Sequence, residues 1–264
     1  MTSVDEQLVY DTAQKHGVPD TVAAELLAHS RPCIYLLQLD ELSPAQRETA
    51  RPAARTGGLP SLPHDTDWPD GKEPLVLTVD CAALPHDVLD IELPTDGHLL
   101  FFSEIEYEPE SSAVLHVPAG ARTAERPSTY DLGGETAHAK VYEPQTLYPV
   151  VGLTLHSDWQ YAPARRAFLS DGDGNGDGNE EILDEFEETV LELAAGGAEF
   201  GVCAQLGGFS SPWDMAPDEG DLVLFAQMAG QSIDHDVYTL NLITGTRQDI
   251  AARRYTALKY TQQC

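Results

Sequence analysis

The sequence has few cysteines, and they are far apart. Cys33, Cys81, Cys203 and Cys264 form no Cys-x-x-Cys pair. A disulfide framework or a structural zinc site needs closely spaced ligands, so we expect neither of them. The spacing favours reduced thiols and therefore a cytosolic protein.

Long apolar runs are also missing. Hydrophobic residues make up 42% of the chain, enough for a core. The run at residues 222–230 is nevertheless much shorter than the roughly 18 residues that a membrane helix needs. The first residues include Asp5 and Glu6, with no basic start and no apolar stretch, so we expect no signal peptide and a cytoplasmic location.

Basic residues are scarce, and the formal net charge is −29. Such a surface repels phosphate backbones and anionic lipids, which argues against nucleic-acid and membrane binding. It would attract a basic protein partner. A general bias of the source organism toward acidic, soluble proteins would give the same composition, and this second interpretation also stays open.

Common catalytic motifs are missing as well. There is no Gly-x-Ser-x-Gly elbow, and Ser210-Ser211 lies in a turn beside proline and tryptophan. Glycines alternate with acidic or amide residues at positions 172–178, where the carboxylates would repel a phosphate. His-Asp occurs at residues 64–65, 86–87 and 235–236, each time in a predicted loop that fixes no catalytic geometry.

Two paired glycines are the most informative feature that is present. Gly57-Gly58 is followed by prolines and a buried strand, and Gly207-Gly208 repeats this layout near the other end. Paired glycines predict sharp turns with positive φ. The echo suggests two duplicated sheet halves with a groove between them, although turn chemistry recurs by chance. Candidate groove residues are Gly57, Gly58, Trp68, Gly207, Gly208, Trp213, His235 and Asp236.

Hydrophobic patterns predict an α+β fold, with largely antiparallel sheets and flanking helices. Helices are expected before residue 17 and at 20–28, 180–194 and 250–254. Strands are expected at 33–39, 75–79, 98–103, 114–117, 139–142, 150–155, 222–228, 237–242 and 255–260. We divide one compact domain into N-terminal helices (1–30), a first sheet half (31–170), an acidic loop (171–180) and a helix with the second half (181–264).

Four longer motifs are spread over the chain: Gly57-Gly58-Leu59-Pro60-x-Leu62-Pro63, Leu93-Pro94-x-x-Gly97-x-Leu99-x-Phe101-Phe102, Leu206-Gly207-Gly208-Phe209 and Asp249-Ile250-Ala251-Ala252-Arg253-Arg254-Tyr255. In these motifs the chain resembles the YwqG-like family of bacterial proteins. The resemblance covers most of residues 31–264 and implies a cytosolic α+β fold with two related halves, but no reaction.

The Gly/Asp/Asn tract near residue 175 has the spacing of a calcium loop. Calcium loops place oxygen ligands at alternate positions, a glycine sixth and a carboxylate twelfth. The register that fits has Gly178 sixth and takes as ligands Asp173, Asn175, Asp177, Asn179, Glu181 and Asp184. A flexible acidic linker has the same composition, and we prefer that interpretation.

The sequence therefore supports a hypothesis about function class and no particular reaction. We expect a non-enzymatic protein-binding module, of a regulatory or immunity type, that recognises a basic protein through an acidic face and a groove. The alternative is a hydrolase whose Asp and His groups meet in that groove, with or without a divalent cation. A third, separate hypothesis is that Ca²⁺ stabilises the chain through residues 173–184.

Overall fold

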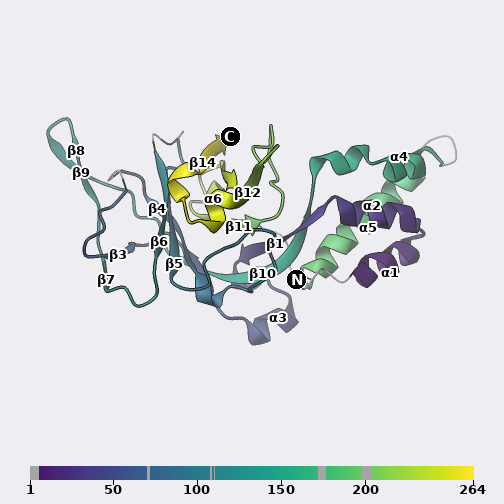
Figure 1. The fold of residues 1–264 in the computed structure, drawn as a ribbon, viewed down its shortest axis with the longest axis horizontal. Helices are drawn as coiled ribbons and strands as arrows, with labels where there is room; N and C mark the ends of the chain where they lie inside the picture. Colours follow the sequence, from purple (N-terminus) through teal and green to yellow (C-terminus); the bar gives the residue numbers. More distant parts are fainter. Residues whose placement is uncertain (1–5, 70–71, 108, 110, 172–176, 198–203) are drawn as a thin grey trace.

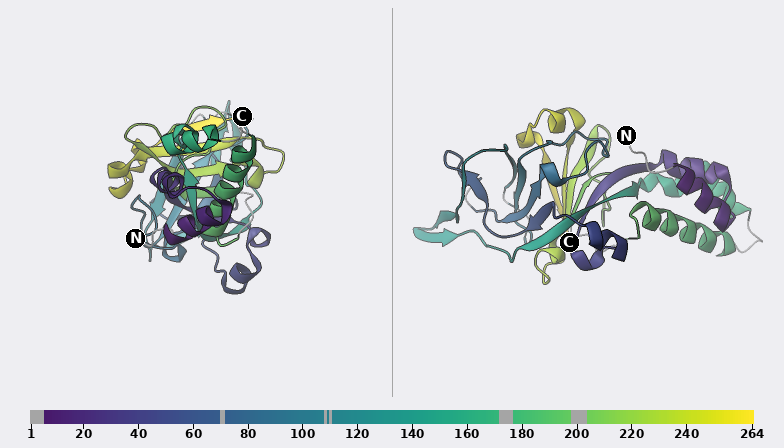
Figure 2. Two further views of the ribbon diagram at one scale, coloured as in Figure 1. Left: turned by 90° about the vertical axis from the view of Figure 1, so that its right-hand side faces the viewer. Right: turned by 90° about the horizontal axis from the view of Figure 1, so that it is seen from below.

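Helices and strands gather at opposite ends of an elongated molecule (Figure 1). In this computed structural model the chain is described except for residues 1–5, 70–71, 108, 110, 172–176 and 198–203. Two long neighbouring strands, β1 (Ser30–Leu37) and β10 (Gln145–Leu155), run from the sheet toward the helices (Figure 2). The expected α+β class with mostly antiparallel strands is confirmed.

The main sheet of the described residues has ten strands in the order β14-β13-β12-β11-β1-β10-β2-β4-β5-β6, and every neighbouring pair is antiparallel. Its other strands are β2 (Ala54–Thr56), β4 (Leu75–Asp80), β5 (His98–Ser103), β6 (Ser112–Val117), β11 (Ala204–Gly207), β12 (Leu222–Ala229), β13 (Leu240–Thr246) and β14 (Lys259–Gln263).

Outward from the central pair of β1 and β10, the strands on both sides of the sheet follow chain order. One side runs β2, β4, β5, β6, and the other runs β11, β12, β13, β14. The expected glycine corners follow β2 and end β11, with φ of 56° and 74° at Gly57 and Gly58 and 64° and 76° at Gly207 and Gly208. The next strand of the main sheet after each corner carries a bulge, near Val76 in β4 and near Phe225 in β12.

The space between the halves is filled by apolar side chains. Phe101 of β5 and Phe225 of β12 lie 5.8 Å apart between ring centroids, and Tyr255 packs on Phe225 at 5.5 Å. All three are buried in one large cluster that draws on both halves. The expected groove between the halves is therefore replaced by a core, because the inward faces of β4, β5 and β12 are almost wholly apolar.

Four helices pack together beyond the sheet, around Leu26, Leu153, Trp159, Phe186 and Val190. Two of them lie near the N-terminus and two lie between residues 163 and 194, so the N-terminal helices share a core with the helix of the second half. Their bounds are α1 (Glu6–His16), α2 (Asp20–Ala28), α4 (Pro163–Ser170) and α5 (Asp177–Ala194). Two shorter helices, α3 (Pro44–Thr49) and α6 (Arg247–Ala251), lie beside the sheet.

Two small two-stranded sheets complete the first half. They pair β3 (Ser61–Pro63) with β7 (Thr123–Glu125), and β8 (Thr129–Leu132) with β9 (Glu135–His138). The β8–β9 hairpin turns at Gly133-Gly134, both with positive φ, and projects from the end of the molecule away from the helices (Figure 1).

Some expected elements differ from the structure. No strand forms at 139–142, and the strand expected from 237 begins at Leu240, because a turn closes from Val237 N–H to Asp234 O at 2.9 Å. Residues 255–257 form a 3₁₀ turn, and the last strand follows at Lys259. Helix α4 was not expected, since its eight residues are too few to set up a clear period.

Candidate functional site

A groove of about 760 Å³ opens on the face of strands β1, β11, β12 and β13 that is turned away from the core between the halves. Its lining is mostly polar and uncharged, although the chain as a whole is strongly acidic. Glu41 is the one carboxylate among the described lining residues, and its Oε2 accepts the backbone N–H of Gln38 at 2.6 Å. Recognition here would depend on hydrogen bonds and aromatic contacts more than on charge.

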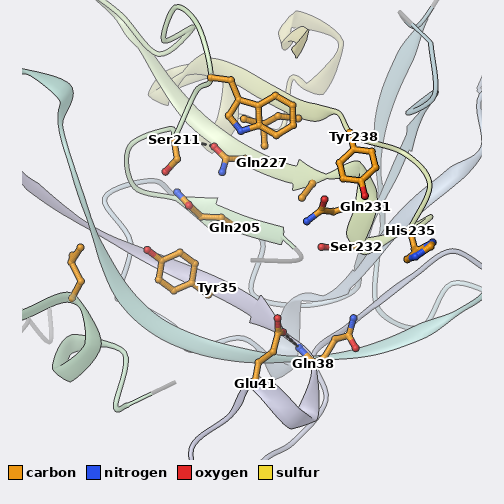
Figure 3. A pocket seen from close by; sticks show the side chains of 14 residues that line it. Tyr35, Gln38, Glu41, Gln205, Ser211, Gln227, Gln231, Ser232, His235 and Tyr238 are labelled. Atoms are coloured by element: carbon orange, nitrogen blue, oxygen red, sulfur yellow. Dashed lines mark hydrogen bonds between the residues drawn. The ribbon is translucent and has the colours of Figure 1, made fainter. Parts of the chain in front are cut away.

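Two glutamines from neighbouring strands lie side by side in this groove (Figure 3). Gln205 of β11 and Gln227 of β12 are direct register partners, so their side chains stand on the same face. They are 1% and 6% exposed. Both are therefore rigid, buried amides that border open space.

The second glycine corner fixes these two amides. Gln205 Nε2 donates to the carbonyl oxygens of Gly207 at 2.8 Å and Phe209 at 2.9 Å. Gln227 Oε1 accepts the backbone N–H of Ser211 at 2.9 Å. Gly208 fits closely here, because a Cβ on it would lie 2.5 Å from Thr154 Oγ1.

Aromatic residues border the groove. Tyr35 of β1 is almost fully buried and donates its hydroxyl to Leu153 O at 2.9 Å, and burial raises the pKa of that hydroxyl, which stays protonated. Trp213 and Tyr238 are 58% and 69% exposed. Large aromatic side chains left open at a concave site are typical of binding surfaces.

A second recess of about 490 Å³ shares Tyr238 with the groove. It contains the carboxylates of Glu106, Asp234 and Asp236 and the amine of Lys140. Lys140 Nζ pairs with Glu106 and, at 2.9 Å, with Asp234 Oδ2. Burial lowers the pKa of Lys140, but these two carboxylates outweigh it, so that the net shift is upward. The recess therefore keeps an excess of negative charge.

The predicted groove residues are divided between several places. Trp213 and His235 line the groove, and Asp236 lines the neighbouring recess. Gly207 and Gly208 form the corner that leads the chain to Ser211.

The first-half candidates lie elsewhere. Gly57 and Gly58 turn against residues 142–144, where Gly58 N–H donates to Tyr142 O at 3.0 Å. Trp68 packs on Phe102 at 5.3 Å between ring centroids and donates its indole N–H to Glu73 O. It is partly buried against a small apolar cluster of the first half that includes Leu75 and Leu100.

The residues proposed for calcium are only partly described. Asp173 and Asn175 lie outside the described residues. Asp177, Asn179, Glu181 and Asp184 belong to helix α5, and Asn179 Nδ2 donates to Phe168 O at 2.7 Å. Over the part of the chain that the structure covers, no group of three or more His, Cys, Asp or Glu residues is placed to hold a metal ion.

The three His-Asp pairs do not meet. His64-Asp65 follows β3, His86-Asp87 lies in the loop before β5, and His235-Asp236 lies before β13. His235 Nδ1 is 3.1 Å from Asp236 Oδ1, but both side chains are about nine-tenths exposed. No observation favours a shared catalytic centre built from these pairs.

Sequence reasoning missed the glutamine pair and Tyr238. One signal was available: Gln205 and Gln227 are polar residues inside otherwise apolar strands, and a buried amide usually has a specific role. The sequence did not show that Gln205 and Gln227 lie next to each other, because this depends on the register of β11 with β12.

Residues 54–264 match a domain of unknown function, DUF1963. The chain belongs to the DUF1963 family. The match includes both glycine corners and both small sheets but begins after β1, so one central strand and one side of the groove lie outside the shared DUF1963 region. The curated proteins include none that matches this DUF1963 chain. None of its described helices has the length and apolar character needed to cross a bilayer.

Proposed function

We propose that the chain is a non-catalytic binding protein and that the groove beside Gln205 and Gln227 is its binding site for a partner protein. The buried amide pair supports this best, because two rigid polar groups are held at the edge of open space by backbone hydrogen bonds. Exposed Trp213 and Tyr238 supply the aromatic contacts that often dominate protein recognition.

The partner is expected to be basic. The net charge of −29 would attract positively charged proteins over a distance, and the recess beside Tyr238 adds carboxylates next to the groove. The same charge disfavours nucleic acids and anionic membranes as partners. A regulatory or immunity-like role in the bacterial cytosol would suit such a module.

The hydrolase alternative receives no support. A hydrolase needs acidic groups and a histidine around one reacting atom. His235 pairs with the solvent-exposed Asp236, and Glu41 is the single carboxylate among the described residues that line the groove. We do not favour calcium binding by residues 173–184, because helix α5 already includes four of the six suggested ligands.

An internal duplication is also proposed, together with the closer relation to YwqG-like proteins that the motifs suggest. Three features support the duplication: the matching order of the outer strands, the positive φ of both corners, and a bulge in the next strand of the main sheet after each corner. In this view a groove developed on one half only.

Affinity capture with a matched pair of variants tests the binding function. The full chain, Trp213→Ala and Tyr161→Ala would be immobilised and exposed to a bacterial lysate at low salt and at about 0.5 M salt. Tyr161 is 64% exposed and lies outside the groove, so Tyr161→Ala controls for nonspecific binding through an exposed aromatic side chain. We expect a basic protein that Tyr161→Ala retains, that Trp213→Ala loses, and that high salt releases. Equal capture by both variants would argue against the groove as the site.

A further inference from the structure

The orientation of the two buried amides in the groove is settled by their protein partners. Gln205 Nε2 faces two carbonyl oxygens, which accept hydrogen bonds and cannot donate, so its Oε1 is the atom left over. Gln227 Oε1 faces the N–H of Ser211, so its Nε2 is left over. The side-chain assignment usually open for a glutamine is therefore fixed at both positions.

These two remaining atoms have no partner among the described residues, and neither is cut off from solvent. Figure 3 shows the two side chains next to each other, between Tyr35 and Tyr238. The groove thus offers one acceptor, Gln205 Oε1, and one donor, Gln227 Nε2, on neighbouring strands.

An extended peptide has the matching pair of groups. In a β-strand the N–H and C=O of one residue point to the same side, which is how two antiparallel residues exchange two hydrogen bonds. A peptide lying over the glutamine pair could donate its N–H to Gln205 and accept from Gln227 with the same residue. Because both protein amides are already ordered, little side-chain entropy would be lost on binding.

The residues around the glutamine pair indicate which kinds of side chain that peptide would carry. Trp213 and Tyr238 are exposed aromatic surfaces at the groove. Beyond Tyr238, the recess holds three carboxylates, and Lys140 pairs with two of them. A Lys or Arg side chain that passes Tyr238 would reach a site of complementary charge.

We infer that the groove binds one extended peptide segment of a partner protein, with a backbone amide on Gln205 and Gln227 and a basic side chain in the recess beside Tyr238. The inference rests on the proposed binding function and adds the chemistry of the bound segment.

A displayed library of random linear peptides, selected on the full chain, tests this inference directly. Selected sequences should share one Lys or Arg, which would bind in the recess. At a fixed spacing from it, the residue whose backbone contacts Gln205 and Gln227 should show no side-chain preference. A synthetic peptide from the selection would then be N-methylated at one amide at a time and measured by fluorescence anisotropy. One position should lose about tenfold or more in affinity when its N–H is removed.

A matched pair of protein variants completes the design. Gln227→Glu keeps the acceptor for Ser211 but replaces the free donor with an acceptor, and should weaken the peptide about tenfold or more. Gln14→Glu adds the same charge on the exposed face of α1 and should bind as the wild type does. Thermal melting would confirm that both variants fold, and the N-methyl series needs no protein variant.

The outcomes separate this inference from the proposed function. In one outcome a protein is captured in a Trp213-dependent way, but no linear peptide binds or no N-methylation weakens binding. That outcome would keep the proposed binding function and would refute the inference that the groove binds an extended peptide. Binding of neutral oligosaccharides from an array, weakened by Gln227→Glu, would replace the peptide with a carbohydrate. If neither protein binding nor peptide binding is weakened by Trp213→Ala, both the proposed function and this inference are wrong.

Discussion

Replacing Gly208 with alanine should destabilise the protein more than the same replacement at a glycine that has a similar positive φ but no atoms near its Cβ position. Gly208 has φ of 76°, and a Cβ there would lie 2.5 Å from Thr154 Oγ1 and 2.8 Å from Cys33 Cβ. Thr154 Oγ1 cannot move freely, because it accepts the N–H of Phe209 at 2.7 Å and is 3.3 Å from Arg31 O, to which it donates.

Two costs add at this position. A non-glycine residue in the left-handed region costs about 1–2 kcal/mol. Overpacking a closed site costs about 1–3 kcal/mol more. We therefore expect Gly208→Ala to lower the free energy of unfolding by about 2–5 kcal/mol, or the melting temperature by about 4–10 °C.

Gly220→Ala is the matched control. Gly220 has φ of 65°, and a Cβ there would meet nothing within 4 Å. This variant should lose only the backbone cost, about 1–2 kcal/mol. The entropy that alanine removes from the unfolded chain is the same in both variants and cancels in their difference.

Urea unfolding of both variants gives the two free energies, and equal m-values would show that the unfolded states are comparable. If Gly208→Ala and Gly220→Ala agree within about 0.5 kcal/mol, the corner is not held tightly between β1 and β10. The reasoning that connects the glycine corner to a rigid groove would then be wrong.

Two further predictions concern other parts of the chain. Glu73 is 5% exposed, and burial raises the pKa of its carboxyl despite two hydrogen bonds from Ser111. The folded state therefore favours the protonated form, and wild-type stability should fall as pH rises from 4.5 toward the raised pKa. In urea titrations at several pH values Glu73→Gln should show a smaller fall, and an identical profile would contradict this. Calcium should raise the melting temperature no more than magnesium at the same concentration, because α5 already begins at Asp177. A calcium-specific rise that Asp184→Asn abolishes would show the opposite.

Local patterns predicted much of the fold. The run of Leu and Phe at 98–103 corresponds to β5, and the apolar face of 180–194 corresponds to most of α5 (Asp177–Ala194). Paired glycines predicted both corners correctly, since few other residues adopt positive φ twice in succession. Each of these signals lies within a few consecutive residues.

The site depended on distant residues and was predicted only in part. Trp68 and Trp213 follow similar glycine turns, but Trp68 is covered by Phe102 whereas Trp213 remains 58% exposed. Nothing near either tryptophan in the sequence decides this, because the covering residue comes from another strand. The same holds for Gln205 and Gln227, which become neighbours only through strand register.

The two corners are held by the same kind of hydrogen bond from different side chains. Arg55 lies two residues before the first corner and donates from Nη2 to Leu59 O at 2.7 Å, and Gln205 occupies the corresponding place and donates to Phe209 O. Their register partners are Thr78 and Gln227.

This correspondence explains why the two halves differ. Thr78 Oγ1 is buried without a hydrogen-bond partner among the described residues, so the first half offers no amide pair to a ligand. The second half has amides at both places, and after they hold the corner one acceptor and one donor remain.

If the corner bond is what these positions share, Arg55→Gln should be tolerated better than Arg55→Leu. Glutamine can still donate to Leu59 O, as Gln205 does to Phe209 O, whereas leucine leaves that carbonyl without its donor. We expect the two variants to differ by about 0.5–1.5 kcal/mol in the free energy of unfolding, measured by urea titration. Equal losses would mean that Arg55 acts through its charge or its packing, and that the two corners are alike in shape only.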